Sequence, residues 1–517
     1  RQAMASHTFI TGSTGTGKSN AVYHLLDEIT KNGQTTFLVV EPAKGEYKNV
    51  FGNCTDVQVF GTNPRETPLL RMNPFAFPEN IHILEHIDRL VEIFNACWPM
   101  YAAMPAVLKD AIERSYQKVG WDLRNSESEK GVFPTFFDLL DILPGVIEES
   151  HYSKDTQSDY VGALCTRVKS LTNGIYGSVL CAEDALTDEA LFDRNVIVDL
   201  SRVGSMETKS LLMGILVMKL QEYRMCSSGM NSRLRHVTVL EEAHNLLRKT
   251  SAEQSQEGAN LQGKSVEMLA NAIAEMRTYG EGFIIADQAP GLLDMSVIRN
   301  TNTKIILRLP DEEDRKLVGK SAALKEAQID ELSKLPLGVA AVYQNEWPEA
   351  VLCKIEAYPM PENAVYHKPS KMPHEINAEF VFGQLAVGKE LEPLSSSEME
   401  QLKLWLKRHE TVLKPEDSRY LERVFAGGEL DVAKTRKAVF DFFGGIGTVV
   451  DYCAAAKKSL TPRKEFLEQL QGQYGLKAAA ADWVLNSVIS MGMSLNPDAK
   501  AVDNLRTNFE QQGGRVL

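Results

Sequence analysis

The eight residues from position 12 to position 19 constrain the fold of this chain more than any other stretch. In order they are Gly12, Ser13, Thr14, Gly15, Thr16, Gly17, Lys18 and Ser19, and they match G-x-x-x-x-G-K-[ST] at every fixed position. A short apolar run, residues 8–11, precedes them, and an amphipathic run that starts at Asn20 follows. A strand, a glycine loop and a helix are the context in which this motif forms a P-loop. The sequence therefore predicts a P-loop set into an α/β sheet.

The chemistry of such a loop is anion capture. Backbone N–H groups and the positive end of the helix dipole surround phosphate groups, so we expect residues 12–20 to hold ATP. Lys18 is expected to reach the β- and γ-phosphates, and the Ser19 hydroxyl to ligate Mg²⁺. The alternative, a glycine-rich turn followed by a chance Lys-Ser pair, is disfavoured by the strand and helix patterns on either side.

Composition limits the class of protein. The chain has 517 residues, enough for two or three domains, and its 44% hydrophobic and 24% charged residues are ordinary for a folded cytosolic protein. No apolar stretch approaches the roughly 18–20 residues of a membrane span. The seven cysteines are scattered without a C-x-x-C pair, which favours reduced thiols over a zinc site or a disulfide framework. We therefore expect a cytoplasmic protein with no membrane segment.

The net charge of −13 counts against a surface that is basic all over. Binding of nucleic acid would have to use a local patch, or a channel that several subunits build together. The candidate cations are Arg233, Arg235, Arg248, Lys249 and Lys264. The last three punctuate a polar stretch, residues 248–265, that is interpreted as a mobile loop, and an ordinary solvated loop is the alternative.

Short apolar runs predict a parallel sheet, because strands that are buried on both faces are apolar throughout. The predicted strands cover residues 8–11, 35–40, 195–200, 236–240, 282–288 and 303–308, with a closing hairpin at 338–343 and 350–353. Between and after these strands the apolar residues recur with a helical period. The fold class is therefore α/β with a helical insertion and a C-terminal helical region. The predicted domains are a core in two parts (1–73 and 191–357), an insertion (74–190), a proline-containing linker or arm (358–394) and a helical domain (395–517).

Two adjacent acids follow the strand at 236–240. In the presence of a P-loop, Glu241 is expected to hold Mg²⁺, and Glu242 to polarise the attacking water, because phosphoryl transfer depends on positioning and charge neutralisation. Surface acids at a strand end are the alternative interpretation. The segment from Glu41 to Tyr47 also ends a strand, where open α/β sheets bind ligands, but a simple turn explains it equally well.

Two further polar residues are candidates for catalysis. Gln288 ends a predicted strand, where its amide could sense the γ-phosphate or orient water. A cation delivered to the transition state also accelerates hydrolysis, and Arg277 is preferred over Arg299 and Arg308 because it lies at a helix end beside residues 278–280. A solvated arginine is the alternative for each of the three.

With these motifs placed, the chain resembles the HerA family of the HerA/FtsK translocase superfamily over roughly residues 5–356. The resemblance rests on the P-loop and on the segments Asn73-Pro74-Phe75, Val237 to Asn245 (with the ending Glu-Glu-Ala-His), Arg277-Thr278-Tyr279-Gly280 and Asp287-Gln288-Ala289-Pro290. The Glu-Glu-Ala-His ending is the most specific of these segments.

The resemblance implies a RecA-like ATPase that works as a homohexameric ring, with double-stranded DNA in the central channel. By motif match it gives Lys18 and Ser19 the phosphate and metal roles, Glu241 the metal role and Glu242 the role of base. Arg277 becomes a finger that reaches the adjacent subunit. The resemblance also implies an effector partner, such as a nuclease of the NurA type or a sirtuin-like subunit of a bacterial anti-phage system.

The chain departs from the family at both ends. Only eleven residues precede the P-loop, so we expect a trimmed sequence from which the family's N-terminal β-barrel is missing, and the region after about residue 395 has no counterpart. A DNA-translocating motor is the leading hypothesis, and an NTPase scaffold that holds an effector enzyme is the second. A conjugation or secretion ATPase of the same superfamily and a small-molecule kinase are weaker alternatives.

Overall fold

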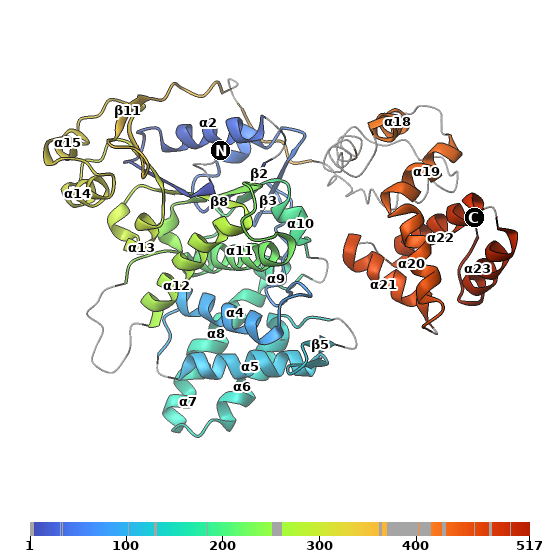
Figure 1. The fold of residues 1–517 in the computed structure, drawn as a ribbon. Coiled ribbons are helices and arrows are strands. Elements are labelled where there is room, and N and C mark those ends of the chain that lie inside the picture. Colours follow the sequence, from blue (N-terminus) through green and yellow to red (C-terminus); the bar gives the residue numbers. More distant parts are fainter. Residues whose placement is uncertain are drawn as a thin grey trace. The chain divides into compact units, whose positions relative to one another are not determined.

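A computed structural model of the chain divides into two compact units, residues 1–368 (unit 1) and 369–517 (unit 2). The structure describes all residues except 1–4, 32, 34, 102, 129–131, 183–184, 251–260, 361–363, 370–401, 403–414, 426–430, 460, 475–477, 497 and 517. Unit 1 holds the sheet, and the described elements of unit 2 are helices (Figure 1).

The main sheet of unit 1 has nine strands among the described residues, in the spatial order β11-β10-β9-β1-β8-β7-β2-β6-β3. Their bounds are β1 (Thr8–Thr11), β2 (Thr36–Glu41), β3 (Val57–Gly61), β6 (Asn195–Asp199), β7 (His236–Glu241), β8 (Glu281–Asp287), β9 (Thr303–Ile306), β10 (Val339–Gln344) and β11 (Val351–Lys354). The seven strands from β9 to β3 are parallel, and β10 and β11 close one edge as an antiparallel hairpin. The strand that precedes the P-loop, β1, therefore lies two positions from β7, which ends in the acidic pair.

Both faces of this sheet are buried, which explains its continuous apolar strands. In β2, Leu38 and Val40 join the core on one face, and Phe37 and Val39 join the core on the other. The second face is covered by α2 (Lys18–Thr30) and α3 (Tyr47–Phe51). The first face is covered by α11 (Met206–Ser227) and α12 (Leu261–Glu275), so that the sheet is the middle of three layers (Figure 1).

Helices built from residues 83–192 lie on the side of the first face. They are α4 (Ile83–Cys97), α5 (Met104–Lys118), α6 (Phe136–Glu149), α7 (Lys154–Tyr160), a π-helical turn (Val161–Cys165), α8 (Thr166–Thr172), α9 (Gly174–Leu180) and α10 (Asp188–Phe192). Of these, α10 contacts β2 and β6 directly. A two-stranded ribbon, β4 (Trp121–Asp122) with β5 (Glu127–Ser128), follows α5. The helix α4 packs against α11 and α12, and α5 and α6 lie beyond it (Figure 1).

Short helices complete unit 1 between and after the later strands. They are three 3₁₀ turns (Ala243–Asn245, Met276–Tyr279 and Pro290–Leu292) and the helices α13 (Met295–Arg299), α14 (Glu312–Ser321) and α15 (Glu326–Glu331). After β11, the chain runs back over α2 and α3. Asn20 in α2 donates to the carbonyl of Glu356 at 2.8 Å and accepts from the N–H of Tyr358 at 2.7 Å. This return segment ties the end of unit 1 to the helix that follows the P-loop.

Unit 2 has a hydrophobic core of its own. Its helices are α18 (Pro415–Phe425), α19 (Val432–Phe442), α20 (Gly445–Ala455), α21 (Pro462–Tyr474), α22 (Ala478–Leu495) and α23 (Ala499–Gln511). In the described parts of both units, no single helix has the length and apolar composition needed to cross a bilayer. The bent pair Ala433–Phe442 and Gly445–Ala455, with 66° between its halves, passes that test by length and composition.

The structure confirms the predicted α/β class and every predicted strand to within about two residues at each end. The sequence analysis missed β3, a short strand at the sheet edge that ends beside Asp199 of β6. The prediction of a loop over residues 248–265 was partly wrong, because α12 already begins at Leu261, where packing against α4 stabilises a polar first turn. Most of the predicted linker and most of the first twenty residues of the predicted helical domain lie outside the described residues. The boundaries of the predicted domains stay predictions.

Candidate functional site

The P-loop joins β1 to α2 and has the backbone that its glycines allow. Gly15 and Gly17 have φ values of 76° and 107°, a region that side-chain-bearing residues rarely adopt. A Cβ atom at Gly12 would lie 2.7 Å from both the Leu307 Cβ and the Thr16 Oγ1. The loop is also fastened to the strand beside it, because the Ser13 N–H donates to the Arg308 carbonyl at 2.9 Å. The turn is therefore preorganised by local sequence and by β9.

The Lys18 ammonium lies inside this loop. It donates to the Gly12 carbonyl at 2.6 Å and approaches the Ser13 carbonyl at 3.4 Å. Burial lowers the pKa of Lys18, whereas the charges of Glu242 and Glu241 act in the opposite direction. Lys18, the first residue of α2, therefore interacts electrostatically with the two acids at the end of β7, more than two hundred residues later in the chain.

Glu241 ends β7 and is almost completely buried, at 6% exposure. Its Oε1 accepts a hydrogen bond from the hydroxyl of Tyr47, the first residue of α3. Burial raises the pKa of Glu241 to about 7, the hydrogen bond from Tyr47 opposes that rise, and the charge of Glu242 adds to it. A carboxylate with a fixed orientation and a hard oxygen donor suits a divalent cation such as Mg²⁺.

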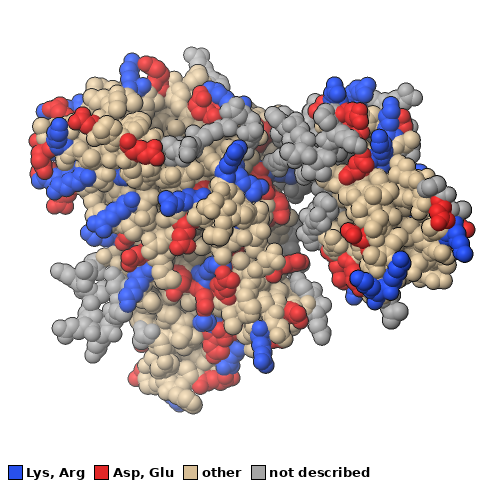
Figure 2. Space-filling model, in the orientation of Figure 1, with Lys and Arg blue, Asp and Glu red and all other residues tan. Residues whose placement is uncertain are grey.

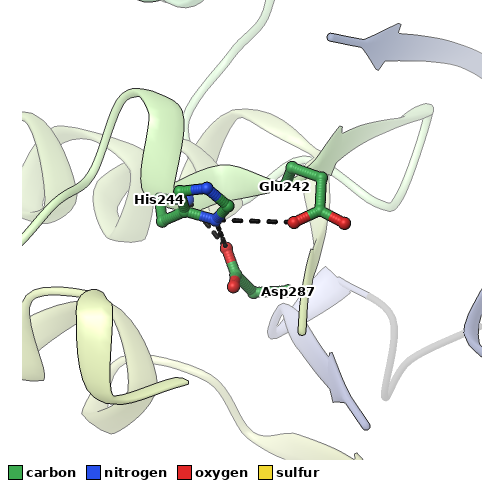
Figure 3. A group of neighbouring side chains, drawn as sticks. All are labelled: Glu242, His244 and Asp287. Atoms are coloured by element: carbon green, nitrogen blue, oxygen red, sulfur yellow. Dashed lines mark hydrogen bonds and ion pairs between the residues drawn. The ribbon is translucent and has the colours of Figure 1, made fainter. Parts of the chain in front are cut away.

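Glu242 has a strained backbone, with φ 45° and ψ 51° in the left-handed region. Such strain in a non-glycine residue persists only where the surroundings impose it. The surroundings here are His244 and Asp287 (Figure 3). Asp287 Oδ2 accepts from the His244 N–H at 2.8 Å and lies 2.9 Å from its Nδ1, while Glu242 Oε2 lies 3.5 Å from the same Nδ1.

This cluster sets the charges around Glu242. Burial raises the pKa of Glu242, Asp287 reinforces that rise and His244 opposes it. The hydrogen bond with Asp287 raises the pKa of His244. Ligand atoms of the three residues lie within 4.8 Å of one another, a spacing that a metal ion could use. Because the imidazole Nδ1 is already bonded to Asp287, we interpret the group as a hydrogen-bonded clamp on the segment that carries Glu242.

Gln288 follows β8 directly and reaches the P-loop. The Thr14 hydroxyl donates to its Oε1 at 2.8 Å. With the amide oxygen occupied in this way, the amide N–H₂ is the end that remains for an anionic ligand. Gln288 and Thr14 thus bring the β8 edge of the sheet into contact with the tip of the phosphate loop.

The turn after β2 forms the opposite wall. Glu41 accepts the N–H of Glu46 at 2.8 Å and that of Tyr47 at 3.1 Å, which folds the turn back on the strand end. Burial raises the pKa of Glu41 to about 8 against these hydrogen bonds. Lys44, at the tip of the turn, has φ 60°, and its nearest ion-pair partner is Glu46 at 3.8 Å. The sequence analysis left this stretch open between a ligand-binding strand end and a simple turn, and it singled out no residue within it.

These walls enclose one pocket of about 210 Å³ at the carboxyl edge of the sheet. Its lining residues are Thr14, Gly15, Gly17, Lys18, Ser19, Asn20, Glu41, Ala43, Lys44, Tyr47, Glu241, Glu242 and Gln288. The structure therefore brings together the predicted phosphate, metal and base residues. The Ser19 hydroxyl and the Glu241 carboxylate are both oxygen donors, as a Mg²⁺ site requires. Asn20 lines the pocket, although its side chain is bonded to the return segment.

Arg277 is not in this pocket. It is exposed and precedes β8, whereas Gln288 follows the same strand, so seven strand residues, roughly 20 Å, separate the two. Arg233 and Arg235 precede β7 and lie at the same far edge. Arg299 and Arg308 are exposed and do not line the pocket, although Arg308 follows β9 beside the P-loop. Any catalytic use of Arg277 therefore needs a second subunit.

Comparison with known proteins shows that the chain is similar to HerA helicases. Residues 2–218 match the family model for the central domain of the helicase HerA. The chain is 25% identical over 370 residues to the DNA double-strand break repair helicase HerA of Sulfolobus acidocaldarius and 22% identical over 360 residues to that of Sulfurisphaera tokodaii. Each match covers 69% of this chain and 66% of the relative, so the chain spans about two thirds of their length.

Solved structures show the same fold at lower identity. VirB4 of Thermoanaerobacter pseudethanolicus has a TM-score of 0.53 and 19% identity, over 68% of this chain and 90% of that one. The plasmid coupling protein TrwB in complex with ADP and Mg²⁺ has a TM-score of 0.50 and 14% identity, over 70% of this chain and 88% of that one. At such identities these likenesses concern the fold alone.

Proposed function

We propose that this chain is a member of the HerA family of P-loop ATPases, that it hydrolyses ATP in the pocket at the carboxyl edge of its sheet, and that it uses the energy to move along double-stranded DNA. The match of residues 2–218 to the central domain of HerA supports the proposal. The observation that carries this proposal is the meeting of Lys18 with Glu241 and Glu242 in one pocket. A P-loop alone binds a nucleotide, whereas a P-loop that faces two acids can also cleave it.

Each residue of the pocket then has a role. The backbone of residues 12–17 and the Lys18 ammonium bind the phosphates. Ser19 and Glu241 hold Mg²⁺, which neutralises charge on the β- and γ-phosphates when it is bound. Glu242 takes a proton from the attacking water, and Gln288 contacts the γ-phosphate through its amide N–H₂.

The proposed assembly is a homohexameric ring. Its support is the position of Arg277, which is exposed at the far edge of the sheet and is therefore available to a neighbour's pocket rather than to its own. An arginine supplied by a neighbour stabilises charge in the transition state and is worth about 10³–10⁵ in rate where it operates. Double-stranded DNA would occupy the channel of the ring, in line with the helicase names of the relatives.

An effector subunit completes the proposal. A nuclease or a sirtuin-like enzyme, as in an anti-phage complex, would use the movement or the nucleotide state of the ring. Unit 2 supports a partner of this kind because it has its own hydrophobic core and so provides a separate folded body for docking.

One observation favours a second candidate, an NTPase scaffold that assembles an effector with little DNA movement of its own. The net charge is −13, and Figure 2 shows lysines and arginines interspersed with acids over the visible face rather than gathered into one basic surface. Such a surface provides little sequence-independent attraction for a phosphate backbone.

The two candidates separate in an ATPase assay with and without double-stranded DNA across a salt series. A motor is stimulated by DNA, and the stimulation falls as salt rises. Absence of stimulation at every salt concentration would favour the scaffold.

Lys18→Ala is expected to lose nucleotide binding, whereas Glu242→Gln should bind ATP and turn over at least about 100-fold more slowly. Glu312→Gln, an exposed acid of α14, is the matched control, and a Glu242→Gln protein as active as this control would refute the role of base.

A further inference from the structure

Tyr47 is a fully buried tyrosine whose hydroxyl has a defined partner in the pocket. Its exposure is 1%, and the hydroxyl donates to Oε1 of Glu241, 194 residues later in the chain. Tyr47 begins α3, whereas Glu241 ends β7, so this contact joins the turn after β2 to the acid that the proposed function assigns to Mg²⁺. The sequence analysis gave no role to Tyr47.

The tyrosine ring is itself held in place from two sides. The backbone N–H of Tyr47 donates to Glu41 Oε2 at 3.1 Å, which fixes the start of α3 against the end of β2. The Tyr23 ring of α2 packs edge-on against the Tyr47 ring, with 5.1 Å between the centroids. These two contacts hold the backbone and the ring of Tyr47 in the position from which its hydroxyl reaches Glu241.

A carboxylate without such a donor rotates between orientations, and a metal must then select one of them. Partners of metal-binding side chains commonly change metal affinity by about 10–100-fold when they are removed. Here the donor occupies Oε1 and leaves the second oxygen of Glu241 for the cation or its water shell. The Lys18 ammonium, which lies in the same pocket, is instead bonded to the Gly12 carbonyl.

We propose that Tyr47 is a positioning residue for the divalent cation, which it serves by fixing the orientation of the Glu241 carboxylate through its hydroxyl. This inference rests on the proposed function, because it takes the metal role of Glu241 as its premise. Tyr47 does not contact the nucleotide or the attacking water in this proposal. It acts only through Glu241, so its loss should weaken binding of the cation more than binding of the nucleotide.

The test uses the full-length chain, Mn²⁺ as the spectroscopic substitute for Mg²⁺, and ADP. Tyr47→Phe removes only the hydroxyl. Tyr23→Phe is the matched control, because Tyr23 is also buried, at 6% exposure, and no hydrogen bond joins its hydroxyl to another described residue. Electron paramagnetic resonance gives the Mn²⁺ concentration at half-saturation in the presence of ADP. We expect it to rise about tenfold in Tyr47→Phe and to stay unchanged in Tyr23→Phe, with ADP binding in EDTA equal in both.

Two further variants separate this inference from its premise. If Glu241→Gln leaves Mn²⁺ affinity unchanged, the metal role of Glu241 in the proposed function is wrong. If Glu241→Gln weakens Mn²⁺ binding but Tyr47→Phe does not, the inference is overturned and the proposed function stands. In the double variant, Tyr47→Phe should cause no additional loss, whereas a general structural defect would lower affinity again and would also lower the thermal midpoint below that of Tyr23→Phe.

Discussion

Asp287 accepts two hydrogen bonds from a single residue, His244: one from its backbone N–H at 2.8 Å and one from its ring Nδ1 at 2.9 Å. The other oxygen of Asp287 accepts the N–H of Ala289 at 2.9 Å. Asp287, at the end of β8, therefore holds the turn that follows β7 through hydrogen bonds. Because Glu242 lies two residues before His244 and has a left-handed backbone, these hydrogen bonds maintain the position of the proposed base.

The first prediction concerns the hydrogen bonds that Asp287 accepts. Asp287→Asn replaces one acceptor oxygen with a donor, so either the His244 contacts or the Ala289 contact must be lost. We expect kcat for ATP to fall about 10–100-fold with little change in KM, because small displacements of a catalytic group have effects of this size. Steady-state kinetics provide the measurement. The control is Asp294→Asn, which retains a helix cap on Ser296 outside the pocket; an equal effect of both substitutions would contradict the prediction.

The second prediction concerns the contact between Thr14 and Gln288. Gln288→Glu keeps an oxygen for the Thr14 hydroxyl but replaces the free amide N–H₂ with a negative charge that faces the phosphates. We expect kcat to fall about 100-fold, as for the loss of a donor to developing charge. Thr14→Val, which removes only the orienting hydroxyl, should cost severalfold, and Thr14→Ser should behave like the parent. Parent-like kinetics for Gln288→Glu would exclude Gln288 from the phosphate site.

The third prediction concerns stability at the far edge of the sheet. Glu281 is fully buried and accepts hydrogen bonds from Arg224 Nε at 2.9 Å and Thr238 Oγ1 at 2.8 Å, with His236 Nδ1 also at 2.8 Å. Glu281→Gln removes one of the two carboxylates that pair with the buried Arg224 charge, the other being Asp193 at 2.8 Å. We expect a loss of about 3–5 kcal/mol in the free energy of unfolding, measured by denaturant titration of unit 1.

This network also predicts a dependence on pH. Burial alone would raise the pKa of Glu281, but His236 and Arg224 hold it at about 2. A lowered pKa stabilises the fold above the ordinary value of 4.5, and that stability is lost as the pH falls from 4.5 towards 2. Glu331→Gln is the control: Glu331 is the last residue of α15 and forms an exposed pair with Lys334, so the substitution should change stability by less than about 1 kcal/mol. Equal losses for the two variants would contradict the assignment.

The fourth prediction concerns Glu41, whose pKa burial raises to about 8. Between pH 4.5 and 8 the folded state keeps a proton that the unfolded state has released, so the free energy of unfolding falls as the pH rises through this window. Glu41→Gln removes this loss of stability, and each pKa unit between the folded and unfolded states corresponds to about 1.4 kcal/mol in the free energy of unfolding. Thermal midpoints at pH 5.5 and 8.5 measure it. The parent should lose more stability than the variant over this range, and parallel curves would show that Glu41 is ionised in the fold.

Much of the fold was predictable because its signals are local. The strands β1, β2, β6, β7 and β8 have mainly apolar interiors between polar ends, and this composition follows from their burial on both faces. The P-loop was also predictable from the sequence, because its glycines are required by the backbone geometry of a single eight-residue loop. In contrast, β3 is a short edge strand, and its pairing with β6 depends on a partner more than a hundred residues away.

The candidate site was predictable in its parts but not in its assembly. Local patterns determined that Lys18, Ser19, Glu241 and Gln288 each lie at the end of a strand or the start of a helix. Only the tertiary structure decided that β8 separates β1 from β7, which sets Gln288 against Thr14 and His244 against Asp287. It alone placed the Tyr47 hydroxyl on Glu241 and Arg277 at the opposite edge. The physical reason is that residue type and spacing encode local conformation, whereas contacts across hundreds of residues follow from the order in which buried strands pair.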